Sequence, residues 1–415
     1  MRFYIFFAVL FSCAFFISTV NALNMQEAIT KATEYSAKIS AQASTTSAAR
    51  FYKYSTYAGF LPSLSAGYTF SHNAPSLSPT YSLNSLNITA NMNVFRGFSD
   101  YLNFAEARQN LARQNLSLSS VKADIILSTK LAYIKVLQNR ALLATASESA
   151  KLLEGQLKKA DSFYQQGLRA KNEVLTMQLQ LSNANITLES AKMNLNYALA
   201  ELSNLLGISI NDDEVSEIDT IDLIEYNKDN LLSLALNNNP DYLSQKSRLE
   251  SANIEFRRAK GVFLPQVDLV GVKYWYIDGA GQASANYGLQ SQVRLNVSLN
   301  LFNGLKDGFS YQVKRYDVLA SKSTLSQYER NLELSLESLL RDYQNAKHQF
   351  QIAQDSLQKA KENYQIINNR YLQNLSTYTE LINAQLLLTT MQTSINQARY
   401  NLISIQANIE RLSNP

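Results

Sequence analysis

Histidine is the side chain that most readily exchanges protons near neutral pH, and this chain has two, His72 and His348. His72 falls in a predicted β-hairpin and His348 in the middle of a predicted helix, and neither has a nucleophile or a cluster of metal-ligating residues beside it in the sequence. The sequence contains no phosphate-binding loop and no dinucleotide fingerprint. It therefore predicts neither an enzyme nor a cofactor, and any energy the protein uses has to come from a partner.

The other chemistry-bearing side chains concentrate in two short segments that match each other. Tyr164-Gln165-Gln166-Gly167-Leu168 recurs 207 residues later as Tyr371-Leu372-Gln373-Asn374-Leu375. Gly167 and Asn374 are residue types that tolerate a left-handed backbone, which a tight turn between two helices requires. We therefore predict two helix tips, followed by these polar or charged segments: Arg169-Ala170-Lys171-Asn172-Glu173 in the first and Ser376-Thr377-Tyr378-Thr379-Glu380 in the second.

The tips belong to a duplication that covers most of the chain. The segment 93–100 recurs as 300–307 at the same offset, with Gly97 matching Gly304. A repeat of this length is a structural half-molecule. The sequence predicts this organisation: a first repeat at 23–207, an acidic linking segment at 208–230 and a second repeat at 231–415.

Each repeat contains a long segment without proline, at 100–166 and at 307–373. As a continuous helix each would be ~100 Å long at 1.5 Å per residue. Apolar residues recur in a narrow seven-residue stripe along both segments, which is typical of helices packed as coiled coils. We expect return helices at 168–206 and 375–412, and a leading helix before each predicted hairpin.

Two predicted β-hairpins, 61–95 and 264–302, alternate apolar and polar residues with period two, which predicts strands with one apolar and one polar face. The alternation is less regular in the strand after Pro265. The strand length fits the ~9–11 residues that a tilted strand needs to cross a bilayer, and aromatic residues lie near the hairpin ends. The residues predicted to face lipid are Leu86, Ile88, Ala90, Met92, Val94, Val293, Leu295, Val297, Leu299 and Leu301.

Four strands cannot close a barrel around a lumen, and open sheet edges are not tolerated in hydrocarbon because unpaired backbone groups are costly there. If these strands cross a membrane, several chains have to share one barrel. The backbone argument leaves the number of chains open, since eight, twelve or sixteen strands would all close.

The N-terminus indicates export. Arg2, an apolar run over 3–17 and Val20-Asn21-Ala22 fit a cleaved secretory signal at 1–22. An uncleaved anchor and a lipoprotein modification of Cys13 remain alternatives. Cys13 is the one cysteine of the chain, so a cleaved chain has no disulfide and no zinc-thiolate site. The formal net charge of +4 is scattered along the helices, which argues against a nucleic-acid partner.

Taken together, the export signal, the two repeats, the hairpins, the long helices and the Tyr-x-x-Gly-Leu tip resemble the TolC family of outer-membrane efflux proteins across essentially the whole mature chain. The resemblance implies a mainly α fold with a membrane β-barrel part: a homotrimer with a shared twelve-stranded barrel in outer-membrane lipid and a helical tunnel across the periplasm. It implies two partners, a periplasmic adaptor (membrane fusion) protein and an inner-membrane pump of the RND, ABC or MFS type.

The resemblance also implies roles for the tips. The adaptor would sit on Gly167, Leu168, Arg169, Ala170, Lys171, Asn374, Leu375 and Ser376. A latch of an acidic residue, a tyrosine and an arginine would close the entrance, and Glu173, beside Asn172, matches the acid while Tyr371 matches the tyrosine. The arginine position holds Ser376, so one link is absent there. The pore-narrowing acidic pair matches Glu380 and Asn383, which leaves one ring of charge.

Three functions remain open at this stage. The first is a passive exit duct for drugs and other toxic small molecules, driven by a separate pump. The second is the same duct serving one-step (type I) protein secretion, since the pump and the adaptor choose the cargo. The third is a coiled-coil surface protein without a pore, which would dissolve without detergent.

Overall fold

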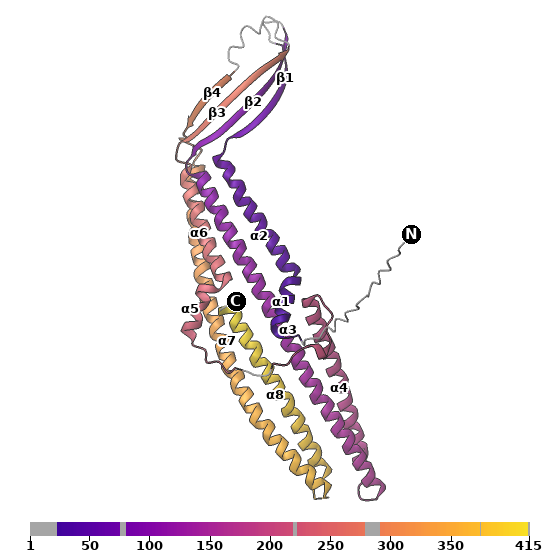
Figure 1. Cartoon of the computed structure of the whole chain (residues 1–415). Helices are drawn as coiled ribbons and strands as arrows, with labels where there is room; N and C mark the ends of the chain where they lie inside the picture. The colour runs from indigo at the N-terminus through magenta and orange to yellow at the C-terminus, as the bar shows by residue number, and fades with distance from the viewer. Residues whose placement is uncertain (1–22, 75–79, 219–221, 279–290, 374, 414–415) are drawn as a thin grey trace, which may run out of the picture. The chain divides into compact units, whose positions relative to one another are not determined.

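The computed structural model describes residues 23–74, 80–218, 222–278, 291–373 and 375–413 (Figure 1). The predicted signal at 1–22 and the predicted tip residue Asn374 lie outside these ranges. The chain forms two compact units, and the long helices α3, α7 and α8 contribute residues to both. Of the described residues, one unit comprises those within Met1–Tyr35, Thr129–Asp222 and Ile352–Tyr400, and the other comprises those within Ser36–Ser128, Leu223–Gln351 and Asn401–Pro415.

The elements follow one another in the order that the duplication predicts. The first repeat contains α1 (Met25–Tyr35), α2 (Ala37–Ser55), η1 (Thr56–Phe60), β1 (Ser63–Asn73), β2 (Tyr81–Arg96), α3 (Ser99–Gln165) and α4 (Lys171–Leu206). The linking segment contains the short η2 (Asp212–Glu214). The second repeat contains α5 (Lys228–Asn238), α6 (Pro240–Gly261), β3 (Gln266–Asp278), β4 (Ser291–Ser298), α7 (Lys306–Leu372) and α8 (Tyr378–Ser413).

The four strands form one antiparallel sheet in the order β1-β2-β3-β4, so the two hairpins join through β2 and β3. The register places Met92 opposite Leu269 and Leu269 opposite Leu295. Side chains directly opposite each other share a face of the sheet. Apolar residues from both repeats therefore form one continuous face, and Val293 on the edge strand β4 is 79% exposed in the single chain.

The predicted fourth strand is too long. β4 ends at Ser298, which pairs with Gln266, the first residue of β3. Beyond that pair β3 offers no further backbone partner, so Leu299 and Leu301 lie outside the strand. β2 continues to Arg96 because Arg96 itself pairs with Gln266.

The leading helix of each repeat is broken once, at equivalent places. Ser36 separates α1 from α2 and its hydroxyl accepts a hydrogen bond from the Ile39 amide, while Asn239 separates α5 from α6 and caps the Asp241 and Tyr242 amides. Asn239 also donates to the Leu412 carbonyl, over 3.1 Å, at the end of α8. Each break is a helix N-cap, so each leading segment forms two helices and not one.

The first part of the linking segment is held against the unit that contains α4. Arg140 on α3 donates to the Asp212 carboxylate over 2.7 Å and to the Val215 carbonyl over 2.9 Å. The buried Tyr133 hydroxyl donates to the carbonyls of Leu23 and Ser216, which brings the start of the described chain to the same place. No described helix has both the length and the apolar character needed to cross a membrane.

Both repeats turn from strand to helix through two consecutive residues with left-handed backbone. Gly97 has φ 56° and Phe98 has φ 65°, and the equivalent Gly304 and Leu305 have φ 57° and 67°. The surroundings of the two glycines differ. A Cβ at Gly97 would collide with the backbone carbonyl of Gly261, whereas a Cβ at Gly304 would meet no atom within 4 Å.

The repeat therefore supplies a matched pair of variants. We expect Gly304→Ala to destabilise the fold by about 1–2 kcal/mol, because only the left-handed backbone is strained. Gly97→Ala should cost roughly 1–3 kcal/mol more, because the Gly261 carbonyl also has to move. Thermal unfolding of the purified protein, followed by circular dichroism, measures both. Equal losses of melting temperature in the two variants would contradict the close approach of Gly97 to Gly261.

Candidate functional site at the helix tips

The first tip is a short turn between α3 and α4. The Leu168 amide donates to the Phe163 carbonyl and the Gly167 amide to the Tyr164 carbonyl, both over 2.9 Å. Gly167 has φ 73°, and a Cβ there would meet no atom within 4 Å. Glycine is needed at this position because of its backbone conformation alone. Leu168 is 58% exposed at the turn, and α4 begins at Lys171, three residues later than predicted.

The second tip closes α7 in the same way, with the Leu375 amide donating to the Arg370 carbonyl over 2.8 Å. α8 begins at Tyr378, again three residues later than predicted. In both tips the described residues between the turn and the next helix are not helical.

A capping box starts α8. The Glu380 carboxylate accepts from the Thr377 amide over 2.9 Å, and the Thr377 hydroxyl accepts from the Glu380 amide over 3.3 Å. The Ser376 hydroxyl donates to the same carboxylate oxygen over 2.6 Å. These hydrogen bonds, that from Ser376 first, lower the pKa of Glu380. The Thr-x-x-Glu spacing was a readable signal for this cap, and the sequence prediction assigned Glu380 only to a pore ring.

The first tip has no such cap, because Ala170 stands where the second tip has Thr377. Glu173, the equivalent of Glu380, instead pairs with Arg169: the guanidinium Nη1 lies 3.7 Å from the carboxylate Oε1, and the two side chains are 18% and 20% exposed. The Arg169 guanidinium also lies over the Tyr371 ring, 5.3 Å from its centroid. Arg169 therefore links α4 to the end of α7.

Tyr371 is the buried centre of this cluster, with 1% of its surface exposed. Its ring packs edge-on against Phe163, with 6.4 Å between centroids. Burial, and then the Glu173 charge, raise the pKa of Tyr371, while Arg169 acts in the opposite direction. Burial also raises the pKa of Tyr378, and Tyr371 and Glu173 add to the increase. Both phenols are therefore held neutral beside the carboxylate.

Three buried polar atoms of the cluster have no hydrogen-bond partner among the described residues: Glu173 Oε2, the Tyr371 hydroxyl and the Tyr378 hydroxyl. Leaving such groups unpaired typically costs 1–3 kcal/mol each. An apolar base holds the cluster in place, where Ala160, Val174 and Met177 are buried and Ile382 packs against them. The cluster therefore combines an apolar base with three polar atoms that are buried and unpaired.

The other predicted tip residues lie at the starts of α4 and α8. Ala170, Lys171 and Asn172 are exposed at the start of α4, and Asn383 is exposed on α8 one turn after Glu380. Their roles in adaptor binding and in the pore ring stay predictions. Among the residues that the structure describes, no group of histidine, cysteine, aspartate and glutamate side chains could hold a metal ion.

Solved structures share this fold over nearly the whole chain. The outer membrane protein VceC of Vibrio cholerae superposes with a TM-score of 0.82 at 15% identity, covering 94% of this chain and 96% of that one. The CmeC outer membrane channel of Campylobacter jejuni gives 0.80 at 15% identity, covering 94% and 85%. The open state of the MtrE outer membrane channel of Neisseria gonorrhoeae gives 0.80 at 14% identity, covering 94% and 88%. A comparison with curated protein sequences found no match.

These likenesses define the fold as that of an outer-membrane channel. The family model described as outer membrane efflux protein matches residues 28–208 and 231–414, which are the two repeats. The protein therefore belongs to the outer membrane efflux protein family, the TolC family that the sequence resembles, and its place is the outer membrane. Members of this family are trimeric transport channels, not enzymes, and they work with adaptors and inner-membrane pumps.

The Glu380 cap predicts how the second tip responds to pH. Because hydrogen bonding holds the folded pKa of Glu380 below the ordinary 4.5, the cap stabilises α8 above that value and is lost as the pH falls through the lowered pKa. A nitroxide at Asn383→Cys, a unique label in a protein that lacks residues 1–22 and with them Cys13, should be immobile at pH 7 and become mobile in acid. Glu380→Ala, which removes the side-chain acceptor of the capping box, should make it mobile at pH 7.

The matched control is Glu189→Ala, which removes an exposed carboxylate of α4 that pairs with Lys192. It should leave the spectrum at Asn383→Cys unchanged. An immobile label in Glu380→Ala at pH 7 would show that the capping box does not hold the start of α8.

Proposed function

We propose that this chain is the exit duct of a tripartite efflux system, which passively carries drugs and other toxic small molecules from an inner-membrane pump and a periplasmic adaptor through the outer membrane. The observation that carries the proposal is the match of both repeats to the efflux family. The contacts of Arg169 with Glu173 and with the Tyr371 ring, which join the two tips, support a gated entrance.

Homotrimer formation has two supports in the chain. The outer edges of β1 and β4 have no strand beside them among the described residues, and such edges need a partner in hydrocarbon. Helix α4 also exposes an apolar stripe with coiled-coil spacing, which needs another helix to cover it. The stripe consists of Leu175, Leu179, Ile186, Met193 and Tyr197. Three copies of the four-stranded sheet would give the twelve-stranded barrel of the family, with the continuous apolar face toward lipid.

We further propose that Arg169, Glu173 and Tyr371 form the entrance latch within one chain. The family pattern places the arginine at Ser376, and Arg169 is the equivalent of Ser376 in the first repeat. The ion pair to Glu173 and the contact with the Tyr371 ring give Arg169 both contacts that a latch arginine needs. The exposed turn residues Leu168 and Leu375 would then be left to seat the adaptor.

The latch predicts a change in conductance. A partly buried ion pair contributes up to about 1 kcal/mol, so Arg169→Gln and Glu173→Gln should each raise the open fraction of single channels roughly fivefold. The double variant should open no more than either single variant, because both remove the same contact. Planar-bilayer recording measures the open fraction, and Lys171→Gln, two residues from Arg169, is the control of equal charge change.

Additive effects of the two substitutions would mean that Arg169 and Glu173 act separately. An unchanged open fraction in all variants would remove the latch from the proposal and leave the duct in place.

The cargo can be identified by deleting the gene and measuring two quantities in the same cultures: the accumulation of a fluorescent dye and the proteins released to the medium. We expect raised dye and an unchanged set of released proteins, because a drug duct carries small molecules only. Normal dye with a missing secreted protein would move the protein to type I secretion, the alternative in which the same duct serves a different pump.

A further inference from the structure

A cleft of about 270 Å³ lies between α3 and α6, the two helices that continue the central strands of the sheet (Figure 1). The Ser247 hydroxyl on α6 donates to Gln109 Oε1 on α3 over 3.2 Å and so joins the two helices. The cleft and the sheet belong to the same compact unit. The lining includes Tyr101, Phe104, Ala105, Arg108, Glu250 and Arg257.

The position of the cleft keeps it accessible in the proposed trimer. α3 follows β2 and α6 precedes β3, which are the two central strands in the order β1-β2-β3-β4. Neighbouring copies would join at the outer strands β1 and β4, and so would lie beside α2 and α7. The space between α3 and α6 is therefore a surface that assembly leaves open.

The charged side chains of the cleft leave one positive charge uncompensated. Arg257 Nη2 lies 3.2 Å from Glu250 Oε1 on the same helix, so this pair is neutral, and both side chains are about half exposed. Arg108 is exposed and pairs with no carboxylate among the residues that the structure describes. Long side chains on a helix point toward its N-terminus, so Arg108 is directed along α3 toward the sheet. The cleft therefore favours a ligand with a single negative charge.

The apolar part of the lining offers contact to a ring. Tyr101, one turn from the sheet, is 62% exposed. Phe104 is held in place by Tyr57 of η1, with 5.0 Å between the ring centroids. Both aromatic residues lie between the sheet and Arg108 along α3. A ligand that combines a ring with a carboxylate would thus meet aromatic surface at one end and a cation at the other.

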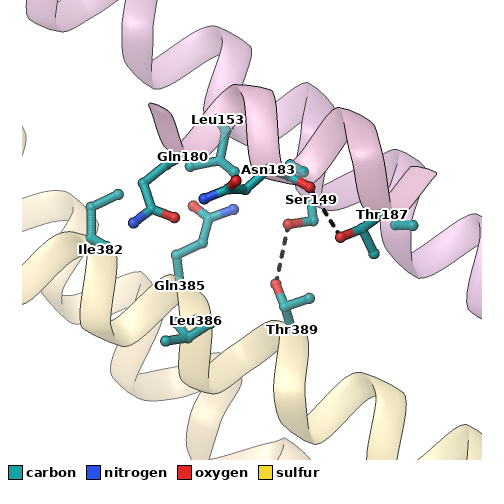
Figure 2. A pocket seen from close by; sticks show the side chains of 11 residues that line it. Ser149, Leu153, Gln180, Asn183, Thr187, Ile382, Gln385, Leu386 and Thr389 are labelled. Atoms are coloured by element: carbon teal, nitrogen blue, oxygen red, sulfur yellow. Dashed lines mark hydrogen bonds between the residues drawn. The ribbon is translucent and has the colours of Figure 1, made fainter. Parts of the chain in front are cut away.

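The chain offers a cleft of the opposite character for comparison. It lies between α3, α4 and α8, and Figure 2 shows that no charged side chain is among its lining residues. An anion would lose its hydration there without compensation. The guanidinium of Arg108, in contrast, is a planar fork that matches the two oxygens of a carboxylate.

The volume sets the size of the ligand. A cavity of about 150 Å³ accepts a benzene ring, so the larger cleft between α3 and α6 accepts a ring that carries a carboxylate and one small substituent. We infer that this cleft is a binding site for aromatic carboxylates, with the carboxylate on the Arg108 guanidinium and the ring against Tyr101 and Phe104.

The test is a fluorine NMR titration of the purified protein in a non-ionic detergent at pH 7, with 4-(trifluoromethyl)benzoate as the probe and the detergent alone as the blank. A ligand of about thirteen non-hydrogen atoms is expected to bind with a Kd of the order of 1 mM. The neutral 4-(trifluoromethyl)benzyl alcohol should bind about fivefold more weakly, because it cannot pair with an exposed arginine. The cationic 4-(trifluoromethyl)benzylamine should bind more weakly still.

Charge variants identify the cation. Arg108→Gln should weaken benzoate binding about fivefold, whereas Arg50→Gln, which removes an exposed arginine of α2 that does not line the cleft, should bind like the wild type. Arg108→Glu should reverse the order, so that the amine binds more tightly than the benzoate. Such a gain of binding cannot come from a misfolded protein.

Steric variants locate the ring. Ala105→Leu fills the cleft from α3 and should abolish binding of all three probes. Ala184→Leu makes the same change in the uncharged cleft of Figure 2 and should leave the binding of all three probes unchanged.

Equal binding of the three probes by the wild type, or undiminished benzoate binding by Arg108→Gln or by Ala105→Leu, would overturn the proposal by placing the probe on another surface. An unchanged order of the probes in Arg108→Glu would also overturn it, as would no binding by the wild type at about ten times the expected Kd. None of these measurements involves transport, so their outcome is independent of the proposed efflux function.

Discussion

The unpaired backbone edges of the sheet are the constraint on which the rest of the proposed assembly depends. Water can satisfy an open edge of a soluble sheet, but hydrocarbon cannot, so an outer-membrane sheet of four strands is incomplete alone. The single chain shows the same incompleteness elsewhere: both faces of β4 are exposed, and α4 exposes an apolar stripe from Leu175 to Tyr197. The sheet edges and the apolar stripe of α4 therefore both need a neighbouring copy of the chain to cover them.

The duplication fixes backbone geometry more strictly than side-chain contacts. Gly97 and Gly304 have the same left-handed conformation, and both leading helices break at an N-cap, yet only Gly97 has a carbonyl packed against it. Turn geometry depends on a few local torsions, which each repeat can keep on its own. Packing depends on which segment lies nearby, and that differs between the repeats. A repeat in the sequence is thus a good guide to turns and a poor guide to contacts.

This difference explains how much the sequence could predict. The ends of α3 and α7 lie within one residue of the predicted ends, because a proline-free stripe that stops at a turn residue is a strong local signal. The end of β4 was wrong because it depends on where β3 begins. The sequence predicted that both tips are functional sites, but it assigned Arg169 only to adaptor binding. Its contact with Tyr371 spans two helix hairpins, and no local pattern in one hairpin reveals it.

The two tips show how a duplicated acid acquires two roles. A carboxylate that accepts from Ser376 and Thr377 is already satisfied, so Glu380 has little to gain from an arginine. At the first tip Ala170 provides no cap, and Glu173 remains available for Arg169. At the first tip, the absence of a side-chain cap therefore leaves Glu173 free to pair with Arg169. An arginine placed at Ser376 would compete with the cap of α8, whereas at the first tip it completes a site that is otherwise unpaired.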